Sequence, residues 1–233
     1  MAPPQLTIVI PVFNEGGTIL KTLDEIHRCV TVSAQIMIVY DSEEDTTLPP
    51  VKQLSPDFTP PVRLLRNAYG HGALNAIKTG LEGSQTDLII VTMADLSDPP
   101  EVINDLVQAA ESSGAAIVCA SRYMKGGRQI GGPKFKGFLS KAAGWILFHF
   151  AHLPTHDPTN SFKLYRKSFL KNNMIESTGG FELGIELVVK AFRSNQTVME
   201  VPTVWRNRVE GKSNFKLWKW LPHYLRWFLY AFR

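Results

Sequence analysis

The chain has 233 residues, of which 44% are hydrophobic and 20% charged, and its formal net charge is +4. This composition predicts one globular domain, alone or with an appendage, and excludes an intrinsically disordered chain. The small charge excess argues against general nucleic-acid binding.

Strand and helix patterns alternate through the first half of the chain. β-branched apolar runs predict strands at 7–12, 34–40, 62–65, 87–93 and 115–119, and apolar residues at helical spacing predict helices at 17–28 and 72–82. This alternation favours a mostly parallel α/β sheet, in which ligands bind beyond the carboxyl ends of the strands. Polar residues at such ends are Asn14, Glu15, Asp41, Asp45, Asp95 and Asp98.

Asp95 and Asp98 follow the strand predicted at 87–93 and precede Pro99 and Pro100. Two carboxylates three residues apart at a strand end suit a hard divalent cation, Mg²⁺ or Mn²⁺, which also binds a diphosphate. The alternative is that Asp98 only caps the helix that the two prolines open.

A glycine loop, RNAYGHGALNAIK at 66–78, runs directly into a predicted helix. Glycines let the backbone approach a ligand closely, and the amino end of a helix favours anionic groups. Tight-turn geometry explains the same glycines equally well.

Several blocks of the chain, in this order, resemble the family 2 glycosyltransferases of GT-A fold. PVFNEGGTI at 11–19 is similar to their P-x-x-N-E opening, YDSEEDTT at 40–47 to their acidic turn, and RNAYGHGALNA at 66–76 to their glycine loop. Further blocks look most like the polyprenyl-phosphate hexose synthases, above all those that make dolichol-phosphate mannose. These blocks are SRYMKGG at 121–127, DPTNSFKLYRK at 157–167, GGFELGIEL at 179–187 and EVPTVWRNRVEGKS at 200–213.

The resemblance implies a Rossmann-like GT-A domain and an activity. The implied reaction is inverting, metal-dependent transfer of a hexose, above all mannose from GDP-mannose, to a polyprenyl or dolichyl phosphate. Two other functions stay open. One is transfer to a glycan or small-molecule hydroxyl, for which Asp157 is the candidate base. The other is nucleotide-sugar binding without turnover, because Met93 replaces the first acid of the usual D-A-D motif. We favour compensation for this loss by Asp98.

The resemblance also implies roles for individual residues. The implied donor-binding residues are Pro11, Phe13, Glu15, Val39, Asp41, Ala94, Asp95, Arg208 and Lys212. The implied metal ligands are Asp95, Ser97 and Asp98, and the implied acceptor-phosphate residues are Arg122, Lys136 and Ser140. Asp95, Arg122 and Asp157 are the implied catalytic residues. The alternative for the basic, glycine-rich stretch at 126–136 is a solvated loop or a mobile lid.

Two apolar stretches suggest contact with a membrane surface. One forms an interfacial helix at about 134–153, within a GT-A domain that we expect to span 1–213. The other, at 214–233, combines basic residues with Trp218, Trp220, Tyr224, Trp227 and Tyr230. The alternative is a pair of core or dimer-forming helices.

Neither stretch reaches the roughly 20 apolar residues of a membrane span. We therefore expect a peripheral protein, with no signal peptide recognised. The two cysteines are too few for a disulfide framework and favour the cytoplasmic face. The oligomeric state is not predicted.

Overall fold

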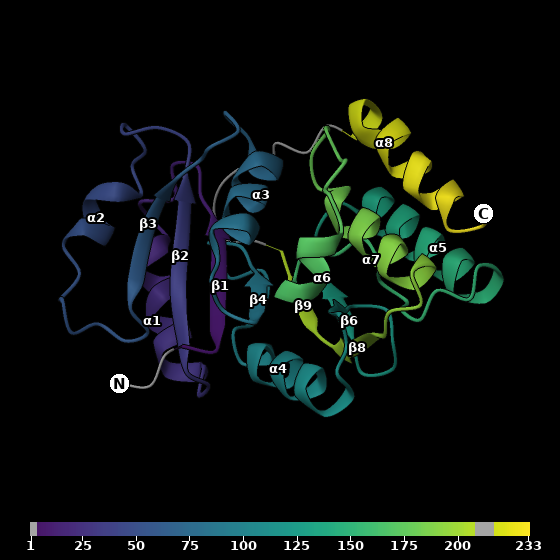
Figure 1. Cartoon of the computed structure of the whole chain (residues 1–233). Coiled ribbons are helices and arrows are strands. Elements are labelled where there is room, and N and C mark those ends of the chain that lie inside the picture. Colours follow the sequence, from purple (N-terminus) through teal and green to yellow (C-terminus); the bar gives the residue numbers. More distant parts are fainter. Residues whose placement is uncertain (1–3, 208–216) are drawn as a thin grey trace.

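A seven-stranded sheet runs through the middle of the protein, as Figure 1 shows for the computed structural model, which describes residues 4–207 and 217–233. Its strand order is β3-β2-β1-β4-β7-β5-β8, and β7 alone among these strands runs antiparallel to its neighbours. The strands are β1 (Leu6–Pro11), β2 (Ala34–Tyr40), β3 (Val62–Arg66), β4 (Leu88–Val91), β5 (Ile117–Ser121), β7 (Lys163–Arg166) and β8 (Val198–Pro202). A separate pair joins β6 (Arg128–Ile130) to β9 (Val204–Arg206).

Alternate side chains of each strand enter two apolar layers, one on either face of the sheet. Ile8 and Ile10 pack into the layer that α1 (Ile19–Cys29) and α4 (Val102–Ser113) cover. Val9 packs into the opposite layer. That layer is covered by α3 (Ala73–Gly83), α5 (Lys134–Phe150), α7 (Leu183–Arg193) and α8 (Leu217–Tyr230). Because both faces are covered, the strands can be apolar almost throughout.

The predicted alternation and mostly parallel sheet are confirmed. Each of the five predicted strands and both predicted helices is present, with ends that differ by a few residues. The antiparallel strand β7 was not predicted, since its four residues KLYR include a buried lysine, Lys163, and show no apolar alternation. Two short helices, α2 (Leu48–Lys52) and α6 (Lys167–Asn172), complete the described elements.

The helix α8 packs against α7 and α5 (Figure 1). Trp227 is only 3% exposed and lies in the core, with Tyr224 and Tyr230 partly buried against it. The expectation that this aromatic face meets lipid is therefore wrong for Trp227. Its large ring is buried in the core where α8 packs against α7, and burial of so large an apolar surface stabilises the fold. The exposed apolar residues of this region are instead Leu225, Leu229 and Phe232. The proposed domain boundary at residue 213 lies outside the described residues and stays a prediction.

The helix α5 has one face in the protein and an aromatic face in solvent. Gly144 and Leu147 are buried, whereas Phe135, Phe138 and Trp145 are more than half exposed. Exposed aromatic rings on one helix face are unusual for a water-facing surface. Among the described residues, no helix combines the length and the apolar character that crossing a bilayer requires.

Candidate active site

The loops after β1 and β2 are joined at the carboxyl edge of the sheet. Asp45 is buried, and its Oδ1 accepts hydrogen bonds from the backbone N–H of Asn14 at 3.1 Å and of Thr47 at 2.8 Å. Asn14 has a φ of 58°, which asparagine tolerates better than most residues. The Thr47 hydroxyl in turn accepts the backbone N–H of Glu15 at 3.0 Å. These bonds fix the P-x-x-N-E turn on the edge.

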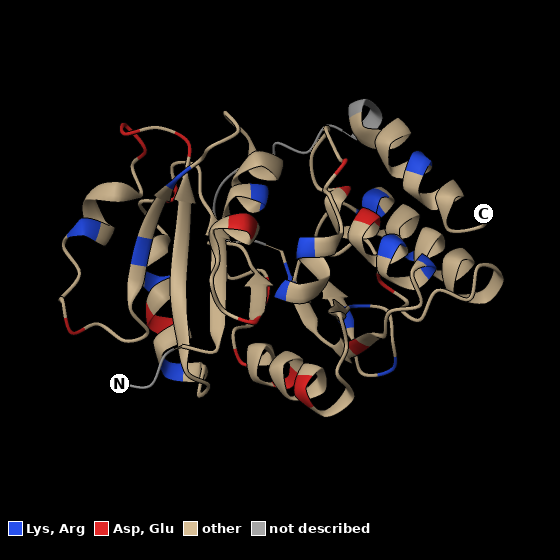
Figure 2. Cartoon of the chain, viewed as in Figure 1, with Lys and Arg blue, Asp and Glu red and all other residues tan. Residues whose placement is uncertain are grey.

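The predicted donor-binding residues of the first two strands fall on this edge. Pro11 and Val39 are paired in register at the ends of β1 and β2, and both are buried. Phe13, just beyond, is 60% exposed. Figure 2 shows no Lys, Arg, Asp or Glu on the ribbons of β1 and β2, and acidic residues on the loop that follows β2. On β1 and β2 the charged residues therefore follow the strands and do not lie within them.

Asp41 holds the glycine loop in place. Its Oδ1 accepts a hydrogen bond from Asn67 Nδ2 at 2.7 Å, and its Oδ2 accepts the backbone N–H of Gly72 at 2.9 Å. Gly72 has a φ of +117°, a backbone conformation that residues other than glycine rarely adopt. The loop glycines therefore have a conformational role, and Asp41 fixes the start of α3.

Met93 does not supply a polar group to the site. It is half-buried and packs against the apolar layer that contains Val9 and Val91. The carboxylates therefore begin at Asp95, whose Oδ1 accepts the backbone N–H of Ser97 at 3.0 Å. Ala94 is buried beside it, and its carbonyl accepts a hydrogen bond from the α1 residue Thr22 at 2.6 Å.

Asp98 is a buried carboxyl group with an unused oxygen. It is 4% exposed, and its Oδ1 has no hydrogen-bond partner among the described residues. Its pKa is raised to about 7, above all by burial and next by the nearby Asp95 carboxylate, while Arg122 acts in the opposite direction. A helix cap accepts backbone N–H groups, so the unpartnered oxygen of Asp98 fits a ligand better than a cap.

The oxygens at this edge fit a hard divalent cation. Asp95 and Asp98 lie close enough for their charges to repel, and a cation between or beside them would relieve that repulsion. Within the described part of the chain no cluster of three or more His, Cys, Asp or Glu side chains is placed to hold a metal ion. The residues fit a metal that takes two carboxylates here, the Ser97 hydroxyl, and its other oxygen ligands from a substrate.

Arg122 and Asp157 form a two-pronged ion pair next to these carboxylates. Arg122 Nε lies 2.6 Å from Asp157 Oδ2, and its Nη2 lies 2.9 Å from Oδ1. Asp157 is fully buried, which acts to raise its pKa, but the Arg122 guanidinium outweighs this and holds the pKa below its ordinary value. Asp157 therefore stays ionised and is a weak base.

Two hydroxyl groups complete the surroundings of Arg122. Its Nη2 also lies 3.1 Å from Ser140 Oγ and 3.4 Å from Thr159 Oγ1, and these two hydroxyl oxygens are 2.5 Å apart. Lys136 is half-buried one turn before Ser140 on α5. The structure thus brings Arg122, Ser140 and Asp157 together, as predicted. The sequence did not single out Thr159 as a site residue, although its position two residues after Asp157 in the same motif could have indicated it.

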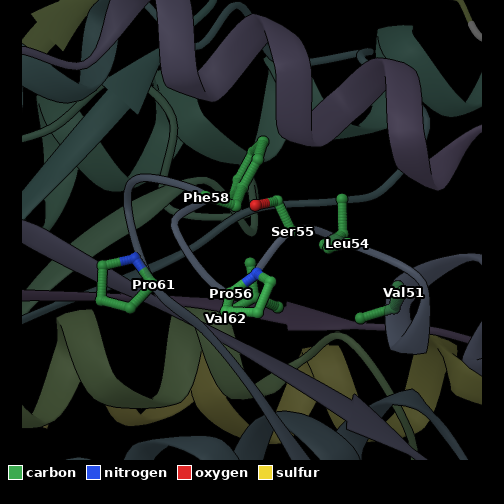
Figure 3. Close-up of a pocket in the computed structure, with 7 residues that line it drawn as sticks. All are labelled: Val51, Leu54, Ser55, Pro56, Phe58, Pro61 and Val62. Carbon is green, nitrogen blue, oxygen red and sulfur yellow. The ribbon is translucent and has the colours of Figure 1, made fainter.

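Other predicted residues lie elsewhere or cannot be placed. Arg208 and Lys212 are outside the described residues. Glu182 and Glu186 are both buried, and they accept backbone N–H groups of the loop before α7. A cavity of about 200 Å³ opens where β3 begins, away from the polar edge (Figure 3). It is lined by Val51, Leu54, Ser55, Pro56, Phe58, Pro61 and Val62.

A mostly parallel sheet covered on both faces, with acidic residues at its carboxyl edge, is a Rossmann-like arrangement of the kind found in GT-A glycosyltransferases. The family model described as glycosyl transferase family 2 matches residues 7–173. The chain therefore belongs to glycosyltransferase family 2.

Two relatives resemble the chain over most of its length. Dolichol-phosphate mannosyltransferase of Pyrococcus furiosus is 29% identical over 230 residues, which are 95% of this chain and 63% of the relative. The chain thus spans less than two thirds of that relative's length. Polyprenol monophosphomannose synthase of Mycolicibacterium smegmatis is 27% identical over 218 residues, or 91% of this chain and 81% of the relative.

A solved structure shares the fold. Glucosyl-3-phosphoglycerate synthase of Mycobacterium tuberculosis, in complex with Mn²⁺, uridine diphosphate and glucosyl-3-phosphoglycerate, has a TM-score of 0.73 at 15% identity. The match covers 99% of this chain and 80% of that one. At this identity the likeness shows the fold alone.

Proposed function

We propose that the protein transfers a hexose from a nucleotide sugar, above all mannose from GDP-mannose, to a polyprenyl phosphate at a membrane surface. The main observation is the cluster of Arg122, Ser140 and Thr159 at the inner face of α5, next to the carboxylates of Asp95 and Asp98. Guanidinium and hydroxyl donors suit a phosphate acceptor, and the neighbouring carboxylates suit a metal-bound diphosphate donor. The names of the two relatives support the same acceptor class.

The acceptor phosphate needs no strong base. Its second pKa is near 6, so at neutral pH it is already an anion. A phosphate oxygen attacks the anomeric carbon of the hexose as the bond from that carbon to the diphosphate oxygen breaks, and the electron pair leaves with the nucleoside diphosphate. A single displacement of this kind inverts the anomeric centre. The protein's contribution is to position both reactants and stabilise developing charge.

The chain's own residues divide these tasks. Arg122 orients the acceptor phosphate through donors that Asp157 does not occupy, with Ser140 and Thr159 offering hydroxyl groups. Asp95 and Asp98, with Ser97, would hold Mg²⁺ or Mn²⁺, which would neutralise charge on the departing diphosphate. Asp41 and the turn around Glu15 would receive the nucleoside, since carboxylates accept hydrogen bonds from base and ribose donors.

A hydroxyl acceptor fits the site less well. It requires a general base, and the candidate for that role was Asp157. The Arg122 guanidinium occupies both of its oxygens and lowers its pKa. The ion pair thus favours an acceptor that arrives already charged.

The exposed aromatic face of α5 would meet the membrane. Phe138 is 67% exposed, and Lys134 and Lys141 lie beside the aromatic residues on the same helix. Aromatic rings with flanking lysines are typical of helices that lie in the interface of anionic membranes. Since Ser140 lies on the inner side of α5, such an orientation would present a lipid head group to Arg122. The cytoplasmic side stays a prediction.

The test is transfer of radiolabelled hexose from a panel of nucleotide sugars to a short polyprenyl phosphate, with Mg²⁺ or Mn²⁺. We expect lipid-linked product with the wild type, loss of product with Asp95→Ala, and wild-type transfer with the exposed control Asp105→Ala. Polyprenol without the phosphate should accept no sugar. Product on the alcohol would favour the hydroxyl acceptor, and nucleotide-sugar binding without product from any donor would favour the binding protein without turnover.

Membrane contact is tested separately with vesicles that contain anionic lipid. Phe138→Ser and Trp145→Ser should each weaken sedimentation with vesicles, while Leu20→Ser, which alters an exposed apolar residue on the far helix α1, should not. Equal sedimentation of all variants would contradict contact through α5.

A further inference from the structure

The turn that contains Asp157 is fixed at both ends by charged side chains from two other places in the sheet. This turn, Thr155 to Asn160, lies between α5 and β7, and its Asp157 orients Arg122. The importance of that orientation for the acceptor rests on the proposed function. The contacts of Glu200 and Lys163 with the turn do not.

Glu200 of β8 binds the residues before Asp157. Its Oε2 accepts hydrogen bonds from the Thr155 hydroxyl at 3.1 Å and from the backbone N–H of His156 at 2.8 Å. Its Oε1 lies 2.6 Å from His156 Nδ1. The Thr155 oxygen then accepts the backbone N–H of Asp157 at 3.1 Å. One carboxylate therefore fixes the start of the turn through three contacts.

Lys163, the first residue of β7, binds the residues after Asp157. Its side chain is fully buried, and its Nζ donates to the carbonyl oxygens of Asn160 and, at 3.1 Å, of Pro158. Burial lowers the pKa of this ammonium group, and the charge of Asp157 acts to raise it. A buried lysine is costly unless its donors are used, so these carbonyl contacts account for its place under the site.

The helix α5 packs closely against the same turn. A Cβ at Gly144 would lie 2.0 Å from the carbonyl oxygen of His156, so only glycine permits this approach. The ring of Phe148 stacks on His156, with ring centroids 3.8 Å apart and an angle of 22° between the planes. The position of the turn is thus linked to the helix that supplies Ser140.

We infer that Glu200 and Lys163 are positioning residues for the acceptor side of the site. Neither has a contact with Arg122 among the hydrogen bonds of the described residues. Each instead holds one end of the turn, so that both Asp157 oxygens meet the Arg122 fork. A two-pronged bond is sensitive to small displacements of either partner, and displacement of a substrate-orienting group by about 1 Å can cost on the order of 100-fold in rate.

The test uses Glu200→Gln in the full chain, with Glu111→Gln as the matched control. The glutamine side chain would keep the shape of the glutamate but lose its charge and one of its two acceptor oxygens, so the Thr155 hydroxyl, the His156 N–H and the His156 ring would no longer all contact a carboxylate. We expect the KM for polyprenyl phosphate to rise at least tenfold, while the KM for the nucleotide sugar stays within twofold of the wild type. Glu111, which accepts a hydrogen bond from Gln5 on the far side of the sheet, should give wild-type values on substitution. An unchanged acceptor KM, or an equal rise in both KM values, would overturn the inference.

A second measurement does not depend on the acceptor. In the wild type, the Nε–H group of Arg122 points at Asp157, so its proton resonance should be shifted downfield and protected from solvent exchange. Arg122→Lys identifies this signal by its loss. Glu200→Gln should move the signal upfield and speed its exchange at least tenfold, and an unchanged signal would refute the positioning role. If the signal moves but the wild type transfers no sugar to polyprenyl phosphate, the proposed function fails and the positioning role stands.

His156→Phe covers the case in which Glu200→Gln does not fold. Phenylalanine keeps the stack on Phe148 and removes only the contact between Nδ1 and Glu200. The same change in the Arg122 signal, of smaller size, is then expected. A signal identical to that of the wild type would refute the inference.

Discussion

Asp98→Asn should stabilise the protein at neutral and alkaline pH in the absence of metal. Asp98 is buried beside a second carboxylate, and its pKa is raised from 3.8 to about 7. The folded protein therefore binds this proton more tightly than the unfolded chain does. As pH rises from about 4 to about 7, the unfolded chain loses the proton first, and the free energy of unfolding falls. Above that window both states are ionised and the loss is complete.

The size of the effect follows from the pKa difference. A rise from 3.8 to about 7 corresponds to about 4 kcal/mol, since each pKa unit is worth about 1.4 kcal/mol. Asparagine has nearly the shape of aspartate and cannot ionise, so Asp98→Asn removes this cost. At pH 8 the variant should be more stable than the wild type by up to about 4 kcal/mol, and at pH 4 the two should be nearly equal.

The assay is urea unfolding in EDTA at one-unit steps from pH 4 to pH 8, followed by circular dichroism. As pH rises over this range, the free energy of unfolding of the wild type and of the exposed control Asp105→Asn should fall in parallel. The fall for Asp98→Asn should be smaller. Mn²⁺ added at pH 8 should raise the stability of the wild type and of the control, and not that of Asp98→Asn. Parallel pH curves for the wild type and Asp98→Asn would refute the assignment of a strained, metal-accepting carboxylate.

Other substitutions test separate parts of the site. Gly72→Ala should lower the free energy of unfolding by about 1–3 kcal/mol and raise the KM for nucleotide sugar, because a residue with a side chain is strained at a φ of +117°. In the control Gly17→Ala the added Cβ meets no atom within 4 Å, so urea titration and kinetics should show no change in either quantity. Arg122→Lys keeps the positive charge but loses the two-pronged guanidinium contact with Asp157, so the rate of hexose transfer should fall by about 10²-fold or more at a fixed donor concentration. Transfer near the wild-type rate would contradict the phosphate-orienting role. Trp227→Ala should cost about 3–5 kcal/mol in urea unfolding, and a cost below about 1 kcal/mol would show that α8 is not part of the core.

The sequence by itself predicted most of the sheet and the edge where the site lies. Strand and helix periodicity is local, so it located the first five strands and the acids that follow them. Those acids necessarily gather at one edge once the strands are parallel. The resemblance to the family 2 glycosyltransferases also grouped Arg122, Lys136 and Ser140 at the acceptor phosphate, with Asp157 as an acid facing the acceptor.

Only the tertiary structure decided how these groups are paired. Arg122 and Asp157 are 35 residues apart, and nothing local indicated that the arginine would occupy both oxygens of the acid and make it a weak base. The same holds for Glu200, which reaches the acid-bearing turn because β8 pairs with β5. Strand β7 was missed because a buried lysine breaks its apolar pattern, and that lysine is explained only by carbonyl groups across the turn.

The two aromatic helical segments show the same division. The sequence identified two aromatic helical segments, but helical periodicity does not say which face meets the protein. The structure turned Trp227 of α8 into the core and left the aromatic face of α5 in solvent. Composition and periodicity determine which elements form, because those preferences act over neighbouring residues, whereas packing between distant elements selects the face each helix buries and the charges that pair.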